Sequence, residues 1–268
     1  MKIHILILLV LFSFIYTESE FGKLIFEENF DNENLNLSIW EYDLGNGVYG
    51  WGNDEQQYYR RNPENIYIKD NQLHIKAKVE KYGTNEYISA KITTKNTFHF
   101  TYGYVEAKIK FPIGKGIWPA FWMLGANIDE VDWPRCGEID IIEVINEEQK
   151  IYNTIHWLTE DNEQASFEKN NNIINREEFH KYSLNWTKDE IIMYFDDEET
   201  FRYELKKIKN DMLEKPFYLL LDLAVGGNWP GFEIDQNAFP LEMIIDYIKI
   251  YQNQENFNYF QKKISFLR

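Results

Sequence analysis

A strand-like stretch rich in Ile carries three carboxylates within six residues: Cys136-Gly137-Glu138-Ile139-Asp140-Ile141-Ile142-Glu143-Val144. Ile and Val favour strands, and residues two apart in a strand share a face, so Glu138 and Asp140 point the same way. Glu143 has the opposite parity. A β-bulge across Ile141 and Ile142 would insert one extra residue and return Glu143 to the face of the other two acids. The stretch therefore predicts a bulged strand with three clustered carboxylates.

Three acids on one face have more than one interpretation. Close carboxylates repel one another and raise at least one pKa. Two carboxylates about 5–5.5 Å apart can cleave a glycosidic bond with retention, one attacking C1 while the other protonates the leaving oxygen. Asp140, between Glu138 and Glu143, could hold the hydrogen bond that separates their pKa values. From these residues alone, a solvated acid row has equal weight, and a calcium site is less favoured because no ligand loop is present.

Length and charge restrict the class of protein. The 268 residues, 44% hydrophobic and 17% aromatic, are enough for one sizeable core or two small domains. The net charge of -16 argues against nucleic acid and anionic membrane as partners. The composition is typical of a soluble protein with a neutral substrate.

The N-terminus has the pattern of an export signal. Met1-Lys2 precedes an apolar run, residues 3–16, which is typical of a secretory signal peptide and short for a membrane span. We expect a signal peptide over about residues 1–19, a folded domain over 20–252 and a C-terminal tail over 253–268. The mature protein is expected to be secreted, monomeric and free of the membrane.

Cys136 is the only cysteine in the chain, so no internal disulfide can form. Cys136 is better interpreted as a small buried core residue than as a catalytic thiol.

Short strands and turns dominate the rest of the chain. Residues 73–79 and 105–111 alternate between apolar and polar, which predicts half-buried strands, and residues 217–225 form an almost continuous apolar strand. Helical patterns are limited to a short turn over residues 177–180 and one amphipathic stretch over residues 205–214. Many short strands with regular turn signals predict a single all-β sandwich.

Tryptophans are concentrated around the acids. Trp118, Trp122, Trp133 and Trp157 flank the acid strand in sequence. Aromatic rings pack against sugar rings, although each one singly is more simply interpreted as a core residue. Their concentration next to Gly and Pro favours the wall of a cleft.

Several blocks occur in the order of one enzyme family: Gly-Trp-Gly-Asn-Asp-Glu-Gln-Gln-Tyr-Tyr (50–59), Trp-Pro-Ala-Phe-Trp-Met-Leu (118–124), Trp-Pro (133–134), Gly-Glu-Ile-Asp-Ile-Ile-Glu (137–143), Ile-His-Trp (155–157), Phe-His-Lys-Tyr (179–182), Leu-Ala-Val-Gly-Gly-Asn-Trp-Pro-Gly (223–231) and Asp-Tyr (246–247). On these blocks, residues 24–251 resemble glycoside hydrolase family 16 enzymes of the laminarinase (endo-β-1,3-glucanase) type. The bulged Glu-x-Asp-x-x-Glu spacing is similar to that of laminarinases, agarases and carrageenases. Lichenases and xyloglucan transglycosylases have strict alternation instead.

The resemblance implies a β-jelly-roll of two curved antiparallel sheets with a glucan cleft on the concave face. It implies Glu138 as nucleophile, Glu143 as acid/base and Asp140 as their hydrogen-bonding assistant. The implied substrate contacts are Asn46, Trp118, Trp122, Trp133 and His156. Two departures from the family pattern are Lys91, where Arg is common, and Asp222, where Asn is common.

The implied function is a secreted retaining endo-hydrolase of β-1,3-glucan, a laminarin-like polysaccharide. A glucan-recognition protein of the same fold is one alternative, but such proteins have lost the catalytic Glu residues that this chain keeps. A hydrolase of mixed-linkage β-1,3-1,4-glucan is the other.

A structural Ca²⁺ is a separate hypothesis. Glu28 and Asp246 share parity with apolar neighbours in the first and last strands, and an acid on an apolar face needs a partner. In many members of the family these strands bind calcium, so Glu28 and Asp246 are candidate ligands, together with backbone carbonyls such as that of Asn71. A hydrogen-bonded acid is the equal alternative.

Overall fold

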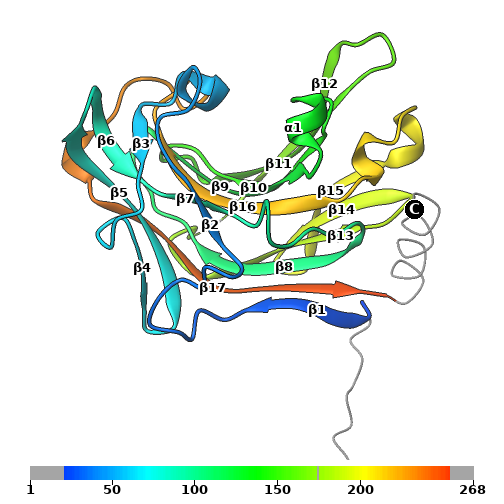
Figure 1. Cartoon of the computed structure of the whole chain (residues 1–268), viewed down its shortest axis with the longest axis horizontal. Coiled ribbons are helices and arrows are strands. Elements are labelled where there is room, and N and C mark those ends of the chain that lie inside the picture. The colour runs from blue at the N-terminus through cyan, green and yellow to red at the C-terminus, as the bar shows by residue number, and fades with distance from the viewer. Residues whose placement is uncertain (1–20, 174, 254–268) are drawn as a thin grey trace, which may run out of the picture.

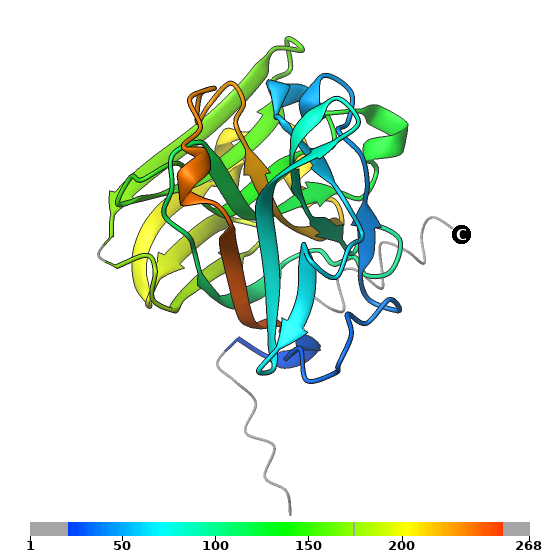
Figure 2. The same cartoon turned by 90° about the vertical axis from the view of Figure 1, so that its left-hand side faces the viewer.

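The computed structural model describes residues 21–173 and 175–253, which fold into two curved β-sheets packed face to face (Figures 1 and 2). The predicted signal peptide and almost all of the predicted C-terminal tail lie outside the described residues. Within the described residues, no helix has both the length and the apolar character that a membrane crossing requires.

The first sheet, called the inner sheet below, has the strand order β12-β11-β10-β9-β16-β7-β2, with antiparallel neighbours throughout. Its strands are β2 (Glu41–Asp43), β7 (Lys91–Thr93), β9 (Ile117–Gly125), β10 (Glu138–Glu143), β11 (Lys150–Leu158), β12 (Gln164–Asn172) and β16 (Phe217–Val225). One face of this sheet is concave, with η1 (Gly50–Asp54) at one side and α1 (Ile128–Val131) and β12 at the other (Figure 1).

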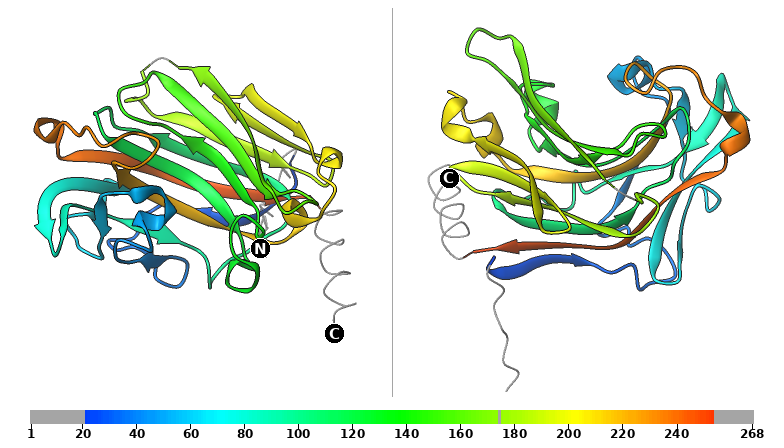
Figure 3. Two further views of the ribbon diagram at one scale, coloured as in Figure 1. Left: turned by 90° about the horizontal axis from the view of Figure 1, so that it is seen from above. Right: turned by 180° about the vertical axis from the view of Figure 1, so that it is seen from behind.

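The second sheet, called the outer sheet, has the order β15-β14-β13-β8-β17-β5-β6-β3, with β1 paired to β17 and β4 paired to β5. Its strands are β1 (Lys23–Glu28), β3 (Gln57–Tyr59), β4 (Ile66–Lys69), β5 (Gln72–Tyr82), β6 (Asn85–Ser89), β8 (Gly103–Lys110), β13 (His180–Trp186), β14 (Glu190–Phe195), β15 (Glu198–Glu204) and β17 (Leu241–Gln252). β3 and β6 pair in parallel, whereas the other described pairs of this sheet are antiparallel. Both sheets curve in the same sense (Figure 3).

The hydrophobic core lies between the sheets. Val105, Ala107 and Ile109 of β8 are fully buried in it, as their alternation predicts. All of β16 is buried, because Phe217 and Leu219 belong to the core while Leu220 and its alternate neighbours line the concave face. The expected all-β sandwich of jelly-roll type is thus confirmed.

The predicted amphipathic helix over residues 205–214 is wrong. The segment forms two 3₁₀ turns, η2 (Leu205–Lys207) and η3 (Met212–Glu214), and Ile208 between them is extended. Leu205, Ile208 and Leu213 are buried in the core, so packing of these anchors replaces a regular helical face. A third 3₁₀ turn, η4 (Gln236–Ala238), precedes the last strand.

Candidate active site

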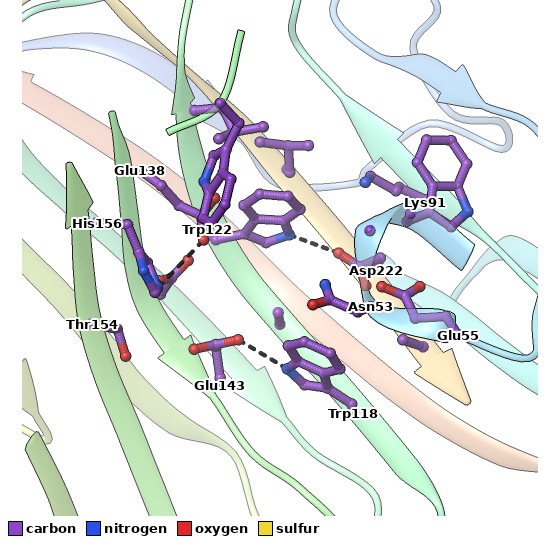
Figure 4. Close-up of a pocket in the computed structure, with 18 of the residues that line it drawn as sticks. Asn53, Glu55, Lys91, Trp118, Trp122, Glu138, Glu143, Thr154, His156 and Asp222 are labelled. Carbon is purple, nitrogen blue, oxygen red and sulfur yellow. Dashed lines mark hydrogen bonds and ion pairs between the residues drawn. The ribbon is translucent and has the colours of Figure 1, made fainter. Parts of the chain in front are cut away.

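A cavity of about 600 Å³ lies on the concave face of the inner sheet. Strands β9, β10, β11 and β16 supply its floor, and η1 supplies part of one wall (Figure 4). A pocket of this size, with convergent polar groups, is the usual form of a small-molecule or sugar site.

The predicted bulge in β10 is confirmed. Against β11 the register runs from Asp140 opposite Thr154 to Glu143 opposite Tyr152, so Ile141 and Ile142 together oppose Asn153. Both Ile side chains are buried in the core. The Asn153 side chain donates from Nδ2 to the Ile141 carbonyl at 2.7 Å, which supplies a partner for a carbonyl of the irregular segment.

The bulge brings all three carboxylates to the concave face, because Glu138, Asp140 and Glu143 all line the cavity. Trp118 donates from Nε1 to Glu143 Oε1 at 2.8 Å. His156 Nε2 lies 3.3 Å from Asp140 Oδ2 and 3.7 Å from Glu138 Oε1. Figure 4 shows Glu138, Glu143 and His156 around the same space. The acids are therefore neither a solvated row nor split between two faces.

Burial dominates the electrostatics of these acids. It raises the pKa of Glu138 to about 8, with a further rise from the charge of Asp140 and opposing contributions from His156, a Trp133 hydrogen bond and Lys91. Burial, followed by the charge of Asp140, also raises the pKa of Glu143 well above its usual range, although the Trp118 hydrogen bond lowers it. The pKa of Asp140 is likewise raised by burial. At neutral pH the cluster therefore holds protons, which a general acid requires.

The structure brings most of the predicted substrate contacts to the cavity. Trp118, Trp122, Trp133 and His156 line it. Trp133 is 42% exposed, and its ring centroid lies 6.0 Å from that of His156. Such an exposed indole beside the acids is available for stacking.

Two other sequence-predicted neighbours of the acids lie elsewhere. Trp157 packs against Tyr203, with ring centroids 5.6 Å apart, and is not among the cavity-lining residues in the described part of the chain. Asn46 is exposed in the loop after β2 and is also absent from the described lining, whereas Asn53 of η1 lines the cavity. The sequence alone could not place this loop, because η1 contains left-handed residues such as Trp51 that no alternation pattern predicts.

A second polar cluster in the cavity was missed by sequence reasoning. The Tyr59 hydroxyl donates to Asp222 Oδ2 at 3.0 Å and also lies 3.3 Å from Glu55 Oε2. The Gln57 side chain donates to the same Glu55 oxygen at 2.6 Å. Trp122 donates from Nε1 to Asp222 Oδ1 at 2.6 Å. Burial, and then the charge of Asp222, raise the pKa of Glu55 to about 7.

Lys91 supplies the positive charge in this second cluster. Its ammonium lies 4.4 Å from the Trp51 ring centroid, 4.9 Å from that of Trp122 and 3.8 Å from Asp43 Oδ2. Cation–π contacts of this kind hold two indoles around one charge. The sequence blocks shared with the family include Glu55 and Tyr59, and Lys91 and Asp222 stand out as departures from the family pattern. No sequence pattern, however, assigned a role to Glu55 or Tyr59.

The candidate calcium ligands both have protein partners. Glu28 is buried and accepts hydrogen bonds from the Phe30 backbone N–H (3.1 Å) and Trp40 Nε1 (3.3 Å). Asp246 is half-buried at a register shift in β17 and pairs with Lys108 Nζ at 2.9 Å. Neither acid is orphaned, so calcium binding stays a prediction. If calcium is bound at these acids, its removal by a chelator should lower the melting temperature of the protein. An unchanged melting temperature would exclude the calcium site.

Comparison with known proteins agrees with this geometry. The model of "Glycosyl hydrolases family 16" matches residues 53–249. The chain is 38% identical over 86% of its length to the clotting factor G alpha subunit of Tachypleus tridentatus, but it spans 34% of that protein. It is 33% identical over 86% of its length to a beta-glucanase of Rhodothermus marinus and covers 85% of that enzyme.

Solved structures show the same likeness. The laminarinase catalytic domain of Thermotoga maritima MSB8 superposes with a TM-score of 0.79 at 36% identity, covering 87% of this chain and 98% of that domain. With the matched model, the relatives and the carboxylate-lined cavity all in agreement, the chain belongs to glycosyl hydrolases family 16 and is a glycoside hydrolase.

Proposed function

We propose that the protein is a retaining endo-hydrolase of β-1,3-glucan, with Glu138 as nucleophile, Glu143 as acid/base and Asp140 as their assistant. The observation that carries the proposal is the bulge in β10, which places these three carboxylates in one cavity. The names of the related beta-glucanase and laminarinase support the substrate class.

The surroundings of the two Glu residues support the division of roles. His156 lowers the pKa of both Glu residues, and Lys91 also lowers that of Glu138, which favours the ionised form that a nucleophile needs. The charge of Asp140 raises the pKa of both Glu residues, and the charge of Glu138 raises that of Glu143 further, which favours the protonated form of Glu143. Trp118 holds one Glu143 oxygen, so the other oxygen can carry the proton toward the leaving group.

The proposed reaction has two steps. The Glu138 carboxylate attacks C1 of the sugar while Glu143 gives its proton to the glycosidic oxygen, so the leaving chain departs as an alcohol and a glycosyl ester forms on Glu138. Glu143, now ionised, takes a proton from water, and the resulting hydroxide displaces Glu138 from C1. Both steps invert C1, so the product keeps its configuration.

The cavity favours a neutral sugar chain. Acids outnumber the cationic side chains Lys91 and Lys95 in its lining, whereas exposed aromatic surface such as that of Trp133 can stack on pyranose faces. A polysaccharide substrate and the N-terminal apolar run both favour secretion, with the protein acting as a monomer outside the cell.

Product analysis tests the substrate and the stereochemistry. We expect laminarin to yield oligosaccharides of β configuration at the new reducing end, followed by NMR during the first turnovers, and mixed-linkage glucan to be cleaved more slowly. Equal or faster cleavage of mixed-linkage glucan would favour that alternative substrate. Binding of laminarin without any products would favour the glucan-recognition alternative.

Variants test the roles. Glu138→Gln should lose nearly all activity, whereas Glu198→Gln, at an exposed acid of the outer sheet, should keep it. Azide should rescue Glu138→Ala with an α-glycosyl azide and Glu143→Ala with a β-glycosyl azide. Full activity of Glu138→Gln would overturn the assignment.

A further inference from the structure

Three side chains of the cavity present metal-binding atoms close together. Glu138, Asp140 and His156 offer one ligand atom each, all within 4.8 Å of one another, and no other such group of three occurs in residues 21–173 and 175–253. The His156 Nε2 atom lies 3.3 Å from Asp140 Oδ2 and 3.7 Å from Glu138 Oε1. Zinc bonds of about 2.0–2.2 Å imply donors roughly 3.3–3.6 Å apart in a tetrahedral site. The two donor separations, 3.3 and 3.7 Å, are close to that range, so small side-chain shifts would let the three donors share one ion.

A second observation points to a ligand at this place. Asp140 is 2% exposed, and its Oδ2 atom has no hydrogen-bond partner within the described structure. The ion pair of this oxygen with His156 Nε2, at 3.3 Å, exists only when His156 is protonated, so beside a neutral imidazole the buried oxygen has no donor. Such an oxygen is costly, and coordination of a cation is one way to satisfy it. This oxygen lies 3.3 Å from His156 Nε2, so it is adjacent to a second donor of the group.

We propose that Glu138, Asp140 and His156 form a binding site for Zn²⁺, and that the bound ion competes with glucan for the cleft. Imidazole and carboxylate ligands suit zinc, whereas calcium and magnesium prefer sites made of oxygen alone. Once both acids have released their protons to the solvent, two carboxylates balance the charge of the dication. The Glu138 and His156 side chains are 17% and 22% exposed, which leaves an entry path and a fourth position for water.

Competition follows from the identity of the ligands. A zinc ion bound to Glu138 would occupy the carboxylate that is proposed to attack C1, so sugar and ion could not use the same oxygen. Binding of zinc itself requires only the donor geometry, and it would persist if the proposed glucanase activity proved wrong.

Calorimetric titration of ZnCl₂ into the purified protein tests the site directly. We expect one ion per chain, with affinity reduced at least tenfold in His156→Ala and in Asp140→Asn. The matched control is His180→Ala, because His180 Nδ1 forms a comparable pair with Asp196 Oδ2 at 2.6 Å on the outer sheet. This control should keep the wild-type affinity.

Three results would overturn the site: no saturable binding, undiminished affinity in His156→Ala, or loss of affinity in His180→Ala. Circular dichroism and melting curves check that the variants fold. If His156→Ala does not fold, diffraction at the zinc absorption edge on wild-type crystals decides the matter. It should place the ion next to His156 Nε2, and an ion elsewhere contradicts the proposal.

Steady-state kinetics test the competition separately. With laminarin as substrate, micromolar Zn²⁺ should raise the apparent KM while leaving kcat unchanged, and EDTA should reverse the effect. A fall in kcat at constant KM would contradict competition at the cleft. If laminarin is not cleaved at all, the proposed function fails, whereas the calorimetric result still stands.

Discussion

At Asp222 the chain carries an acid that interacts with two neighbours in the cavity. One oxygen accepts from Trp122 Nε1 and the other from the Tyr59 hydroxyl, while the charge raises the pKa of Glu55. An amide at this position would keep an acceptor for Trp122 and remove the charge. The acid therefore acts mainly on the proton affinity of Glu55 rather than on the position of the indole.

This interpretation predicts the effect of Asp222→Asn. The pKa of Glu55 should fall below its value of about 7, because the second-largest cause of its rise is removed. The free energy of unfolding at pH 8 should rise by about 1.4 kcal/mol for each unit of that fall. Carboxyl ¹³C NMR titration and urea unfolding measure the two quantities. An unchanged Glu55 titration would show that Asp222 does not act on it.

Trp118 is hydrogen-bonded directly to the proposed acid/base. Its Nε1–H donates to Glu143 at 2.8 Å and lowers the pKa of that carboxyl. Trp118→Phe keeps an aromatic ring but removes the donor, so the pKa of Glu143 should rise further. A hydrogen bond to a charged group contributes about 1.5–3 kcal/mol, which corresponds to roughly one to two pKa units.

The pH dependence of kcat/KM measures this change. In Trp118→Phe the alkaline limb should move to higher pH, because the acid stays protonated longer, and kcat should fall about tenfold or more. The matched control is Trp157→Phe, whose indole packs against Tyr203 outside the cavity. If both variants give the same pH profile, the hydrogen bond does not tune the acid.

At the scale of elements, the bulge in β10 is the feature on which the site depends. Its irregular segment is stabilised from the neighbouring strand β11, where Asn153 is fully buried and donates to the Ile141 carbonyl. Asn153→Ala leaves this carbonyl without that donor. We expect a loss of about 1–3 kcal/mol in unfolding free energy together with a loss of activity, because Glu143 is no longer held on the concave face.

Asn171→Ala provides the comparison for this variant. Asn171 donates from Nδ2 to the Thr200 carbonyl at 3.1 Å, far from the acids in sequence and on the edge strand β12. Urea unfolding gives the stability loss of each variant, and initial rates at a temperature where both are folded give the activity. Equal activity in the two variants would mean that Asn153 supports the fold and not the geometry of the carboxylates.

A register shift within a strand can be predicted from the sequence where charged residues mark which face each position takes. The bulge at Ile141 and Ile142 could be predicted because the acids on either side mark the change of face. The register shift in β17 between Ile245 and Tyr247 could not be predicted from parity, because apolar residues surround it. Parity consequently placed Asp246 on the wrong side of the last strand, where it is half-buried and paired with Lys108.

Contacts across the fold explain the remaining misses. Glu55 and Asp222 lie far apart in sequence, and they meet because the segment after η1 is joined to the end of β16, where the Gln56 backbone N–H donates to the Val225 carbonyl at 2.8 Å. The backbone of η1, with left-handed Trp51, sets which side chains of the glycine-rich block enter the cavity, so Asn53 lines it and Asn46 does not. Local patterns carry no information on such a turn.

At the scale of the whole molecule, the acid-lined cavity reduces stability as pH rises. Five acids of the cavity have raised pKa values: Glu55, Glu138, Asp140, Glu143 and Asp222. For a carboxyl whose pKa is higher in the folded state than in the unfolded state, the contribution to the free energy of unfolding is fully present at pH values below the unfolded-state pKa. That stability is lost as pH rises through the folded value. A binding site made of repelling acids is thus retained at a cost in stability.

Glu138→Gln isolates this effect. Its pKa rises from 4.5 to about 8, so the wild-type free energy of unfolding should fall between these pH values by up to about 1.4 kcal/mol per pH unit for this residue. Glutamine cannot ionise, so the variant should lose less stability over the same window and should be the more stable protein at pH 8, despite being inactive. Urea unfolding at half-unit pH steps gives both curves. Glu198→Gln, at an exposed acid outside the cavity, should follow the wild type. Parallel curves for wild type and Glu138→Gln would mean that the cavity acids do not control the pH dependence.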